Sequence, residues 1–509
     1  MRAGVPEVGL EDVGHVAHEV DRVVPHQRQP GLIEGVVDRP LLQLVLNGRD
    51  RHAHHNRLSA VTSTALLTDH YELTMLQASL HSGAAQRRSV FEMFGRRLPD
   101  GRRYGVVAGV GRLIDALGKF RFGEHELADL ARRKVVDQRT LDYLRDYRFT
   151  GDMWGYVEGE VYFPGSPLLI VEGTFAEAVL LETLVLSIYN HDCAIAAAAS
   201  RMATAAGGRP LIEMGSRRTH EEAGVAAARA AYICGFSTTS NLEAGRRHGI
   251  PTAGTSAHSF TLLHDTEEEA FAAQIAALGK GTTVLVDTYD VTAAVHTAVR
   301  LAGPDLGAVR LDSGDLVTQA HEVRALLDSL GNTRTRIVVT SDLDEYAIAA
   351  LAAAPVDAYG VGTSLVTGSG APTAGLVYKL VAREDGAGKL VGVAKASKDK
   401  KSVGGRKYAL RRVNHSGDAE AEIIGIGERP ANDGNDRELL VQLMAAGEPV
   451  VDTSADAARA HHKRALAELP AGAKRLSRGE PVIPTEYLED AKPSPAGRER
   501  PDAAPSAPA

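Results

Sequence analysis

The residues best suited to carry out chemistry lie at 254–260, where Gly254, hydroxyl side chains and His258 follow one another closely. A short strand-like segment over 250–253 precedes them. Polar loops at the carboxyl ends of strands are where α/β proteins bind ligands. An isolated histidine is usually an ordinary loop or core residue, so the role of His258 depends on whether similar polar groups recur along the chain.

Such polar groups do recur after other strand-like segments. The clusters occupy residues 215–218, 287–290, 310–315, 341–342 and 360–363. Titratable groups at the ends of many successive strands indicate the mouth of a barrel, because an open sheet concentrates them at one switch point.

Three arginines and a glycine-containing turn in these clusters can bind anions. Arg217, Arg218 and Arg310 offer permanent positive charge to a phosphate or a carboxylate. Gly362 and Thr363 offer backbone N–H groups and a hydroxyl after a late strand, the usual place for phosphate in a barrel. The same glycine pattern also occurs in plain tight turns.

The aspartates allow two interpretations. Asp287, Asp312 and Asp315 can hold Mg²⁺, directly or through waters, or bind the hydroxyls of a sugar. Each can instead cap the helix that follows its strand, and for Asp290 and Asp342 we predict this capping role. Taken together, the cations, carboxylates and glycine turn indicate a phosphorylated sugar substrate with magnesium.

A regular alternation of strands and helices positions these clusters. Strand-like runs occur at 210–214, 250–253, 283–286, 308–311, 336–340 and 356–360, separated by helical runs such as 266–278 and 316–330. This βα repeat predicts a parallel sheet covered by helices. We predict an irregular TIM-like α/β barrel.

The rest of the chain lacks this repeat. We predict an α+β N-terminal domain over 61–190, the barrel over 191–385, a C-terminal segment over 386–485 that packs back on the N-terminal domain, and a disordered tail over 486–509. Residues 1–60 show no sustained periodicity and are interpreted as an unstructured extension, or as a misassigned start whose true position is near Val61.

Composition narrows the class of protein. The chain has 509 residues, 44% of them hydrophobic, and a formal charge of −8, which argues against a general nucleic-acid binder. Its two cysteines, Cys193 and Cys234, fit a reducing compartment. No run approaches the roughly 18 apolar residues of a membrane span. No signal peptide is recognisable, so we expect a cytoplasmic protein without a membrane partner.

With these residues identified, the chain from about 65 to 410 resembles the nicotinate phosphoribosyltransferases. The resemblance rests on motifs in one order: Thr68-Asp69-x-Tyr71-x-x-Thr74-Met75, Leu181-Glu182-Thr183-Leu184 leading to Asn190, Glu213-Met214-Gly215-Ser216-Arg217-Arg218, Gly254-Thr255-x-Ala257-His258-Ser259-Phe260, Asp287-Thr288-Tyr289, Arg310-x-Asp312-Ser313-Gly314-Asp315, Gly360-x-Gly362-Thr363 and Val377-Tyr378-Lys379-Leu380.

The resemblance implies a type II phosphoribosyltransferase fold and a place in NAD biosynthesis. Nicotinate and phosphoribosyl pyrophosphate would give nicotinate mononucleotide and pyrophosphate, with Mg²⁺ as cofactor. ATP would be a co-substrate, hydrolysed through a phosphohistidine in a ligase-type reaction. The resemblance also implies a homodimer with active sites near the subunit interface.

The resemblance also implies roles in binding the base for residues that match the family motifs. His258 would be the phosphorylated histidine, while Tyr71, Thr255 and Arg310 would contact nicotinate. Arg217 would sit near its ring and carboxylate. We expect a carboxylate beside the ring nitrogen of the histidine that does not take the phosphate, because such a partner fixes the tautomer.

The sugar and phosphate roles are carried over in the same way. Asp287 and Asp312 would lie near ribose and magnesium, and either is the expected neighbour of the histidine. Gly362 and Thr363 would bind the 5-phosphate, with Thr367 as a second candidate for that contact. Departure of pyrophosphate develops positive charge on the sugar and negative charge on the phosphates, which magnesium and carboxylates stabilise.

One departure and two alternatives accompany the resemblance. The basic tract at 395–407 has Gly404 where the family commonly has proline, which puts the shape of that loop in doubt. A nicotinamide-specific relative would carry an aspartate in the segment equivalent to 236–241, whereas this chain has hydroxyls and an amide there, which favours nicotinate. A non-catalytic nucleotide-binding relative is disfavoured by the intact His258 and Asp312.

Deletion of residues 1–60 is expected to leave a soluble, active protein, because this segment lacks periodicity and the family pattern begins after it. Expression of the truncated chain and an activity assay test this, and mass spectrometry of the native N-terminus tests the start near Val61. Loss of soluble, active protein on truncation would refute the prediction.

Overall fold

The computed structural model describes residues 62–99, 101–395 and 402–488. The predicted N-terminal extension, part of the basic tract at 395–407 and the predicted tail beyond 488 therefore lie outside the described residues. The predicted start of the tail at 486 is wrong, because residues 486 and 487 belong to a strand over Thr485–Tyr487 that pairs with a neighbouring strand. Within the described ranges, no helix is long and apolar enough to cross a membrane.

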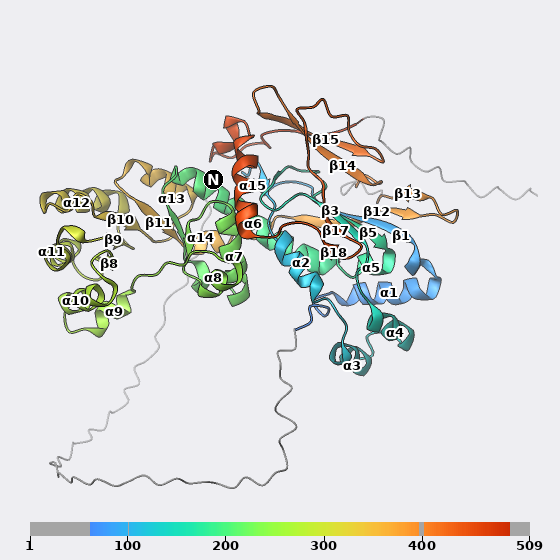
Figure 1. The fold of residues 1–509 in the computed structure, drawn as a ribbon, viewed down its shortest axis with the longest axis horizontal. Helices are drawn as coiled ribbons and strands as arrows, with labels where there is room; N and C mark the ends of the chain where they lie inside the picture. The colour runs from blue at the N-terminus through green and yellow to red at the C-terminus, as the bar shows by residue number, and fades with distance from the viewer. Residues whose placement is uncertain (1–61, 100, 396–401, 489–509) are drawn as a thin grey trace, which may run out of the picture. The chain divides into compact units, whose positions relative to one another are not determined.

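A seven-stranded antiparallel sheet organises the first hydrophobic core (Figure 1). Helix α5 (Phe175–Val179) packs against its strand β1, and α6 (Glu182–Ala206) packs against β12. In spatial order the strands are β13 (Leu390–Gly392), β12 (Leu376–Glu384), β1 (Arg88–Gly95), β5 (Leu169–Thr174), β3 (Asp152–Gly155), β17 (Val441–Ala445) and β18 (Glu448–Pro449). Segments from both halves of the chain thus share one sheet.

Smaller elements complete this region. Helix α1 (His70–Ser82) packs against α5. The others are η1 (Ala84–Gln86), the paired strands β2 (Gly105–Val106) and β4 (Val161–Tyr162), and helices α2 (Val110–Gly118), α3 (Glu124–Arg132) and α4 (Gln138–Asp146).

A six-stranded parallel sheet forms the predicted barrel. Its order is β7 (Thr238–Thr239), β6 (Leu211–Glu213), β11 (Ala358–Val361), β10 (Arg336–Val339), β9 (Ala308–Leu311) and β8 (Thr283–Leu285). The first strand of the repeat, β6, pairs with the last, β11, as it does when a sheet curls into a barrel. In the described residues no pairing joins Thr252 to β8, so the barrel is open on that side.

The prediction of a TIM-like barrel is therefore confirmed, with two local corrections. Residues 250–253 are not a strand: they form one isolated bridge, between Thr239 and Thr252. The two-residue strand β7 was not predicted, because it is too short to show a period.

Helices connect and cover the barrel strands, and Figure 1 shows α10, α11 and α12 along one side of β8 to β10. They are η2 (Gly215–Arg218), α7 (Glu221–Ile233), α8 (Leu242–His248), α9 (His258–Leu263), α10 (Glu267–Leu278), α11 (Val291–Ala302), η3 (Gly303–Asp305), α12 (Leu316–Ser329), α13 (Glu345–Ala350), η4 (Leu351–Ala353) and α14 (Thr363–Val366).

The barrel strands bury alternate residues on the helix side. Val309 and Leu311 of β9 and Ile337 and Val339 of β10 are all fully buried in the second core. Burial of a branched side chain of this kind stabilises the fold by roughly 1.5–3 kcal/mol. The alternation turns Arg310, between two of these residues, to the opposite face of the sheet.

The last part of the chain adds a small four-stranded sheet. Its order is β16 (Arg437–Glu438), β14 (Lys407–Val413), β15 (Ala419–Ile426) and β19 (Thr485–Tyr487), with α15 (Ala455–Ala467) and η5 (Ala471–Lys474) beside it. Arg411 of β14 is fully buried and donates to Glu422 of β15 at 2.6 Å. Removing either partner would destabilise the hairpin, because it would leave a buried charge unpaired.

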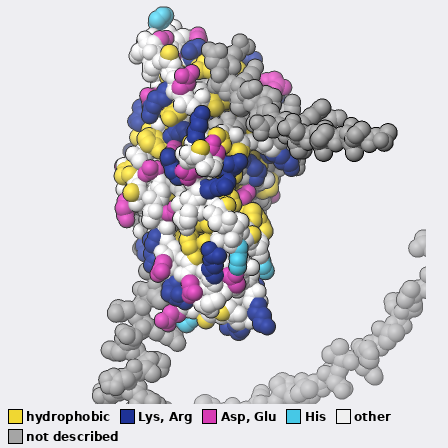
Figure 2. All heavy atoms as spheres, turned by 90° about the vertical axis from the view of Figure 1, so that its right-hand side faces the viewer, with side chains coloured by type: hydrophobic (Ala, Val, Ile, Leu, Met, Phe, Trp, Pro, Cys, Tyr) yellow, Lys and Arg dark blue, Asp and Glu magenta, His cyan; other side chains and the backbone are white. Residues whose placement is uncertain are grey.

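Charges of both signs share the surface drawn in Figure 2. Lys and Arg side chains lie among Asp and Glu side chains on this face. Nucleic-acid binders concentrate basic side chains in one stripe or patch. The face drawn in Figure 2 shows no such basic patch, in line with the net charge of −8.

A close backbone approach at Gly307 gives a test of how β9 is held. A Cβ added there would overlap the carbonyl oxygen of Gly281, so Gly307→Ala should destabilise the chain by about 1–3 kcal/mol, the usual effect of overpacking. Gly281→Ala is the matched control, because the space around that Cβ is open. Urea denaturation of both variants checks this, and equal stability of the two would contradict it.

Candidate active site

Arg310 links the barrel to the loop that the sequence singled out. Its Nη1 donates to the hydroxyl of Thr255 at 2.6 Å, so strand β9 and residues 254–260 meet. Burial lowers the pKa of Arg310 below its usual value, as does the nearby charge of Arg217, while the carboxylates of Asp312 and Asp287 raise it. The guanidinium therefore feels the charges of Arg217, Asp287 and Asp312, and it stays cationic.

Two carboxylates are fixed next to it. Asp287, after β8, accepts hydrogen bonds through Oδ2 from the backbone N–H of Asp312 at 2.9 Å and from the Ser313 hydroxyl at 2.7 Å. Asp312, after β9, accepts through Oδ1 from the hydroxyl of Thr340. Because both side chains are held by neighbours, their remaining oxygens are presented in a defined direction.

His258 begins α9 and faces the same group of residues. Its Nδ1 lies 3.1 Å from the hydroxyl of Thr288, and its Nε2 lies 3.9 Å from Oδ2 of Asp312. The expectation that a carboxylate directly bonds the imidazole is wrong: the partner at hydrogen-bond distance is a hydroxyl. Asp312 is close enough for a charge interaction but too far for a direct hydrogen bond.

Two buried polar atoms at this mouth have no partner among the described residues. They are Nε of Arg310 and Oδ1 of Asp287. An unpaired buried polar group costs about 1–3 kcal/mol, so native proteins rarely keep one without a purpose. The pair points to a ligand that brings an anionic group to Arg310 and a cation to Asp287.

The aspartates fit magnesium only with help from a ligand. No group of three or more His, Cys, Asp or Glu side chains in the described part of the chain can hold a metal by itself. Mg²⁺ is commonly bound by one or two carboxylates together with waters and substrate phosphates. Asp287 and Asp312 therefore suit a magnesium ion that arrives with a phosphorylated substrate.

The arginine turn and the glycine turn are packed against each other. A Cβ added at Gly215, which begins η2, would overlap Val366 and lie 3.1 Å from the carbonyl oxygen of Gly362. Only glycine lets η2 lie this close to the start of α14. The element η2, which carries Arg217, therefore packs against α14, which begins at Thr363.

A buried carboxylate joins this turn to the hydroxyl segment at 236–241. Glu213 accepts from the backbone N–H of Gly215 at 2.5 Å and from the hydroxyl of Thr239 at 2.5 Å, and burial raises its pKa. Asn241 donates through Nδ2 to the hydroxyl of Ser216 at 2.9 Å. The segment that was expected to discriminate nicotinate from nicotinamide thus lies beside the arginine turn.

The sequence reasoning missed the residues that hold others in place: Thr288, Ser313, Thr340 and Glu213. Thr288, Ser313 and Glu213 lie inside motifs that the sequence already offered, and Thr340 ends a predicted strand. Their position next to chemically active residues was the available signal. Which of them bonds which group depends on contacts across strands, and spacing does not encode those contacts.

Of the two predicted helix caps, one is confirmed and one is wrong. Asp290 caps α11 by accepting from Ala293 N–H at 2.7 Å, which confirms that prediction, and Asp315 caps α12 through Thr318. The predicted cap at Asp342 is wrong, because Asp344 caps α13 instead. The turn in which Leu343 N–H donates to Ser341 at 2.8 Å delays the start of that helix.

Tyr71 is not brought to the barrel mouth within one chain. It lies on α1, is exposed, and neighbours Glu182. Burial of its hydroxyl region and the charge of Glu182 raise the pKa of Tyr71 to about 12. No contact in the described residues joins it to Arg310 or Thr255.

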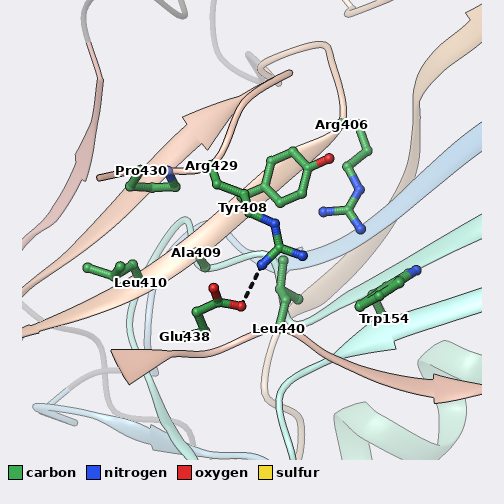
Figure 3. Close-up of a pocket in the computed structure, with 9 residues that line it drawn as sticks. All are labelled: Trp154, Arg406, Tyr408, Ala409, Leu410, Arg429, Pro430, Glu438 and Leu440. Atoms are coloured by element: carbon green, nitrogen blue, oxygen red, sulfur yellow. Dashed lines mark hydrogen bonds and ion pairs between the residues drawn. The ribbon is translucent and has the colours of Figure 1, made fainter. Parts of the chain in front are cut away.

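A separate groove lies between the first sheet and the small sheet (Figure 3). Trp154, Arg406, Tyr408 and Arg429 contribute to its lining. Arg429 pairs with Glu438 at 2.5 Å, and Arg406 pairs with Glu172 at 3.0 Å. Since its cations already have carboxylate partners, the barrel mouth is the better candidate for the active site.

Comparison with known proteins agrees with this geometry. A family model for the nicotinate phosphoribosyltransferase (NAPRTase) N-terminal domain matches residues 66–190. Nicotinate phosphoribosyltransferase pncB1 of Mycobacterium tuberculosis H37Rv is 59% identical over 432 residues, covering 83% of this chain and 95% of that protein. Human nicotinate phosphoribosyltransferase is 31% identical over 456 residues, covering 75% and 83% respectively.

Solved structures agree as well. The crystal structure of human nicotinic acid phosphoribosyltransferase superposes with a TM-score of 0.72 at 26% identity, covering 84% of this chain and 98% of that chain. A Pyrococcus furiosus nicotinate-nucleotide pyrophosphorylase shares the fold, with a TM-score of 0.65 at 23% identity and coverage of 84% and 99%.

Fold and mouth together define the class of α/β-barrel phosphoribosyltransferases. Within this class, the chain belongs to the nicotinate phosphoribosyltransferase family, which confirms the resemblance noted in its motifs.

The capping role of Asp315 gives a pH-dependent test. The hydrogen bonds from Thr318 hold the pKa of Asp315 below its ordinary value, so the cap stabilises the fold at neutral pH and this contribution is lost as pH falls through the lowered value. Asp315→Ala should therefore lower stability at pH 7 but not in acid, with kcat/KM unchanged. Urea melts at both pH values check this, and a loss of turnover would instead indicate a role at the active site.

Proposed function

We propose that this protein joins nicotinate to phosphoribosyl pyrophosphate, giving nicotinate mononucleotide and pyrophosphate in NAD biosynthesis. The observation that carries the proposal is the pair of buried, unpartnered atoms, Nε of Arg310 and Oδ1 of Asp287, at one barrel mouth of a chain in this family. One atom suits the carboxylate of nicotinate, and the other suits the magnesium of the phosphorylated sugar. The buried thiols Cys193 and Cys234, which are not disulfide-bonded, fit a reaction in the cytoplasm.

Arg310 and Thr255 are the proposed contacts for nicotinate. Since Nη1 of Arg310 already donates to Thr255, its Nε is left to donate to the carboxylate, and the pair is held in place before the ligand arrives. Arg217 adds positive charge nearby. A carboxylate gains more than an amide from these cations, which favours nicotinate over nicotinamide.

The proposed sugar and magnesium contacts are Asp287 and Asp312. Mg²⁺, when bound with the substrate, supplies the charge that stabilises the departing pyrophosphate. Oδ2 of Asp287 is held by Asp312 N–H and Ser313, which leaves Oδ1 without a partner and available to the ion. Both carboxylates then stand near the C1 carbon, where positive charge develops as the bond to pyrophosphate breaks.

Gly362 and Thr363 are the proposed contacts for the 5-phosphate. The hydroxyl of Thr367, the second candidate, donates to the carbonyl oxygen of Thr363 at 2.9 Å, so its proton is already used within the turn. Thr363 begins α14 beside the arginine turn. This contrast favours Thr363.

His258 is the proposed acceptor of the γ-phosphoryl group of ATP. Thr288 holds Nδ1, which leaves Nε2 as the nucleophile. A bond forms between this nitrogen and the phosphorus while the bond from phosphorus to the ADP oxygen breaks, and ADP leaves. Water later cleaves the N–P bond and releases phosphate. The added charge, close to that of other phosphorylated side chains, can order the loop over the bound sugar.

A homodimer completes the proposed site. Tyr71 is exposed on α1 and makes no contact with Arg310 among the described residues, and Leu66, Leu67 and Met75, close to it in the sequence, are also exposed. Exposed apolar side chains that gather in one region mark interaction surfaces. We therefore assign Tyr71 to the nicotinate site of a second copy.

Turnover with each base tests the proposed function. Pyrophosphate and mononucleotide formation are measured with nicotinate or nicotinamide, each with and without ATP, in the presence of Mg²⁺. We expect turnover with nicotinate, stimulated by ATP. Preference for nicotinamide would favour the nicotinamide-specific alternative, and no turnover with either base would favour a non-catalytic nucleotide-binding protein.

Arg310→Lys should weaken nicotinate binding by about 1–3 kcal/mol, because lysine keeps the charge but loses the planar donor group. The KM for nicotinate measures this. Arg300→Lys is the control, since Arg300 pairs with Glu268 on the surface at 2.7 Å. An unchanged nicotinate KM in the Arg310 variant would assign Arg310 to the phosphates or to the fold.

His258→Asn should abolish nicotinate-independent ATP hydrolysis and acid-labile labelling from γ-labelled ATP, while slow ATP-independent synthesis remains. The reason is that the groups proposed for transfer are intact in this variant. His264→Asn is the control, because His264 directly follows the same helix and its Nδ1 lies 2.8 Å from the Phe260 carbonyl oxygen. Histidine labelling in the His258 variant would refute the assignment, and loss of basal synthesis would make His258 part of the transfer machinery.

A further inference from the structure

A buried cluster of ionic side chains lies directly behind the glycine turn of the barrel. At its centre is Glu345, the first residue of α13, which accepts from Nε of Arg201 at 3.0 Å and from the hydroxyl of Ser369 at 2.5 Å. Arg102 approaches the same carboxylate, with Nη1 at 3.5 Å from its Oε1. All three ionic residues are at least 94% buried.

The cluster holds the backbone that follows α14. Arg102 donates through Nη2 to the carbonyl oxygen of Gly368 at 2.8 Å. The next residue, Ser369, donates its hydroxyl to Glu345. Ser369 has φ +52°, in the left-handed region that a residue with a side chain seldom adopts. Strained backbone of this kind persists only where surrounding contacts fix it, and such strain gathers at ligand clamps.

This anchoring determines where the start of α14 lies. The helix has only four residues, Thr363–Val366, so it has little stability of its own and depends on what holds its two ends. Gly215 packs against Gly362 and Val366, at the two ends of the helix, and the backbone N–H of Ser369 donates to the carbonyl oxygen of Ser364 at 2.6 Å. A shift of Ser369 would therefore be transmitted to Thr363.

The charge of the cluster also suits a phosphate. Arg102 and Arg201 carry two positive charges against the single negative charge of Glu345, which leaves one buried excess positive charge. Nη1 of Arg102 has no hydrogen-bond partner among the described residues. A buried excess charge is costly, and an anion bound at the adjacent turn offsets part of that cost.

We propose that Glu345, together with Arg102 and Ser369, positions the turn at 362–367 for the 5-phosphate of phosphoribosyl pyrophosphate. None of the three touches the reacting atoms; they act through the backbone of the turn. The inference rests on the proposed function, because it assigns that substrate to the turn.

Ser369→Ala and Glu345→Gln test the proposal. Both should raise the KM for phosphoribosyl pyrophosphate fivefold or more while the KM for nicotinate changes less than twofold. Ser369→Ala removes a single hydroxyl from a partly exposed residue, so it remains informative if Glu345→Gln does not fold. The matched control is Glu92→Gln, since Glu92 forms an equally buried pair with Lys407 in the first core. That variant should lose thermal stability without a change in either KM.

Two outcomes would overturn the proposal. One is an unchanged KM for phosphoribosyl pyrophosphate in both cluster variants, with only the melting temperature lowered. The other is an equal rise of both KM values. Calorimetric titration of phosphoribosyl pyrophosphate with Mg²⁺ into the unmodified chain and into the Ser369 variant repeats the test without turnover. If the chain proves inactive, the proposed function is refuted. The difference in affinity for phosphoribosyl pyrophosphate between the unmodified chain and the Ser369 variant still tests the cluster.

Discussion

One physical constraint underlies the proposed site: a buried charged group seldom keeps an atom without a hydrogen-bond partner, and such an atom calls for a group that completes it. In Arg310, Nη1 is hydrogen-bonded within the chain, whereas the buried Nε has no partner in the described residues. In Asp287, Oδ2 is hydrogen-bonded and the buried Oδ1 has no partner there. The hydrogen bonds orient each side chain and so set the direction of its unpaired atom. The groove at Trp154 is lined by arginines that already have carboxylate partners, and so it lacks this feature.

The barrel brings these polar residues together at one rim. Parallel strands bring their carboxyl ends to one rim, so β8, β9 and β10 deliver Asp287, Arg310 and Thr340 to neighbouring positions. Fully buried branched residues on the helix side hold each strand while the polar residues face the rim. The sheet does not close between Thr252 and β8, and there the loop that carries Thr255 and His258 reaches across to the rim.

Much of this arrangement could be predicted from the sequence, for identifiable reasons. Strand β9 was predicted with its observed bounds, because its apolar residues are buried and a polar cluster follows it. The prediction of a strand over 250–253 was wrong, because the barrel is open there and this segment has no neighbouring strand on its second side. The cap at Asp344 depends on a local turn, and the hydroxyl beside His258 depends on a contact between separate loops. Periodicity describes single elements and does not specify which loops meet. Motifs, in turn, do not predict that Tyr71 is exposed on α1.

A crystal structure of the chain with nicotinate, Mg²⁺ and a non-reactive analogue of phosphoribosyl pyrophosphate is the most direct test of the central claim. The account predicts the nicotinate carboxylate on Nε of Arg310 and the magnesium ion on Oδ1 of Asp287, which would give both buried atoms the partners they lack. Density for the ligands in the groove beside Trp154, or ligands at the barrel mouth that leave both atoms unpartnered, would contradict it.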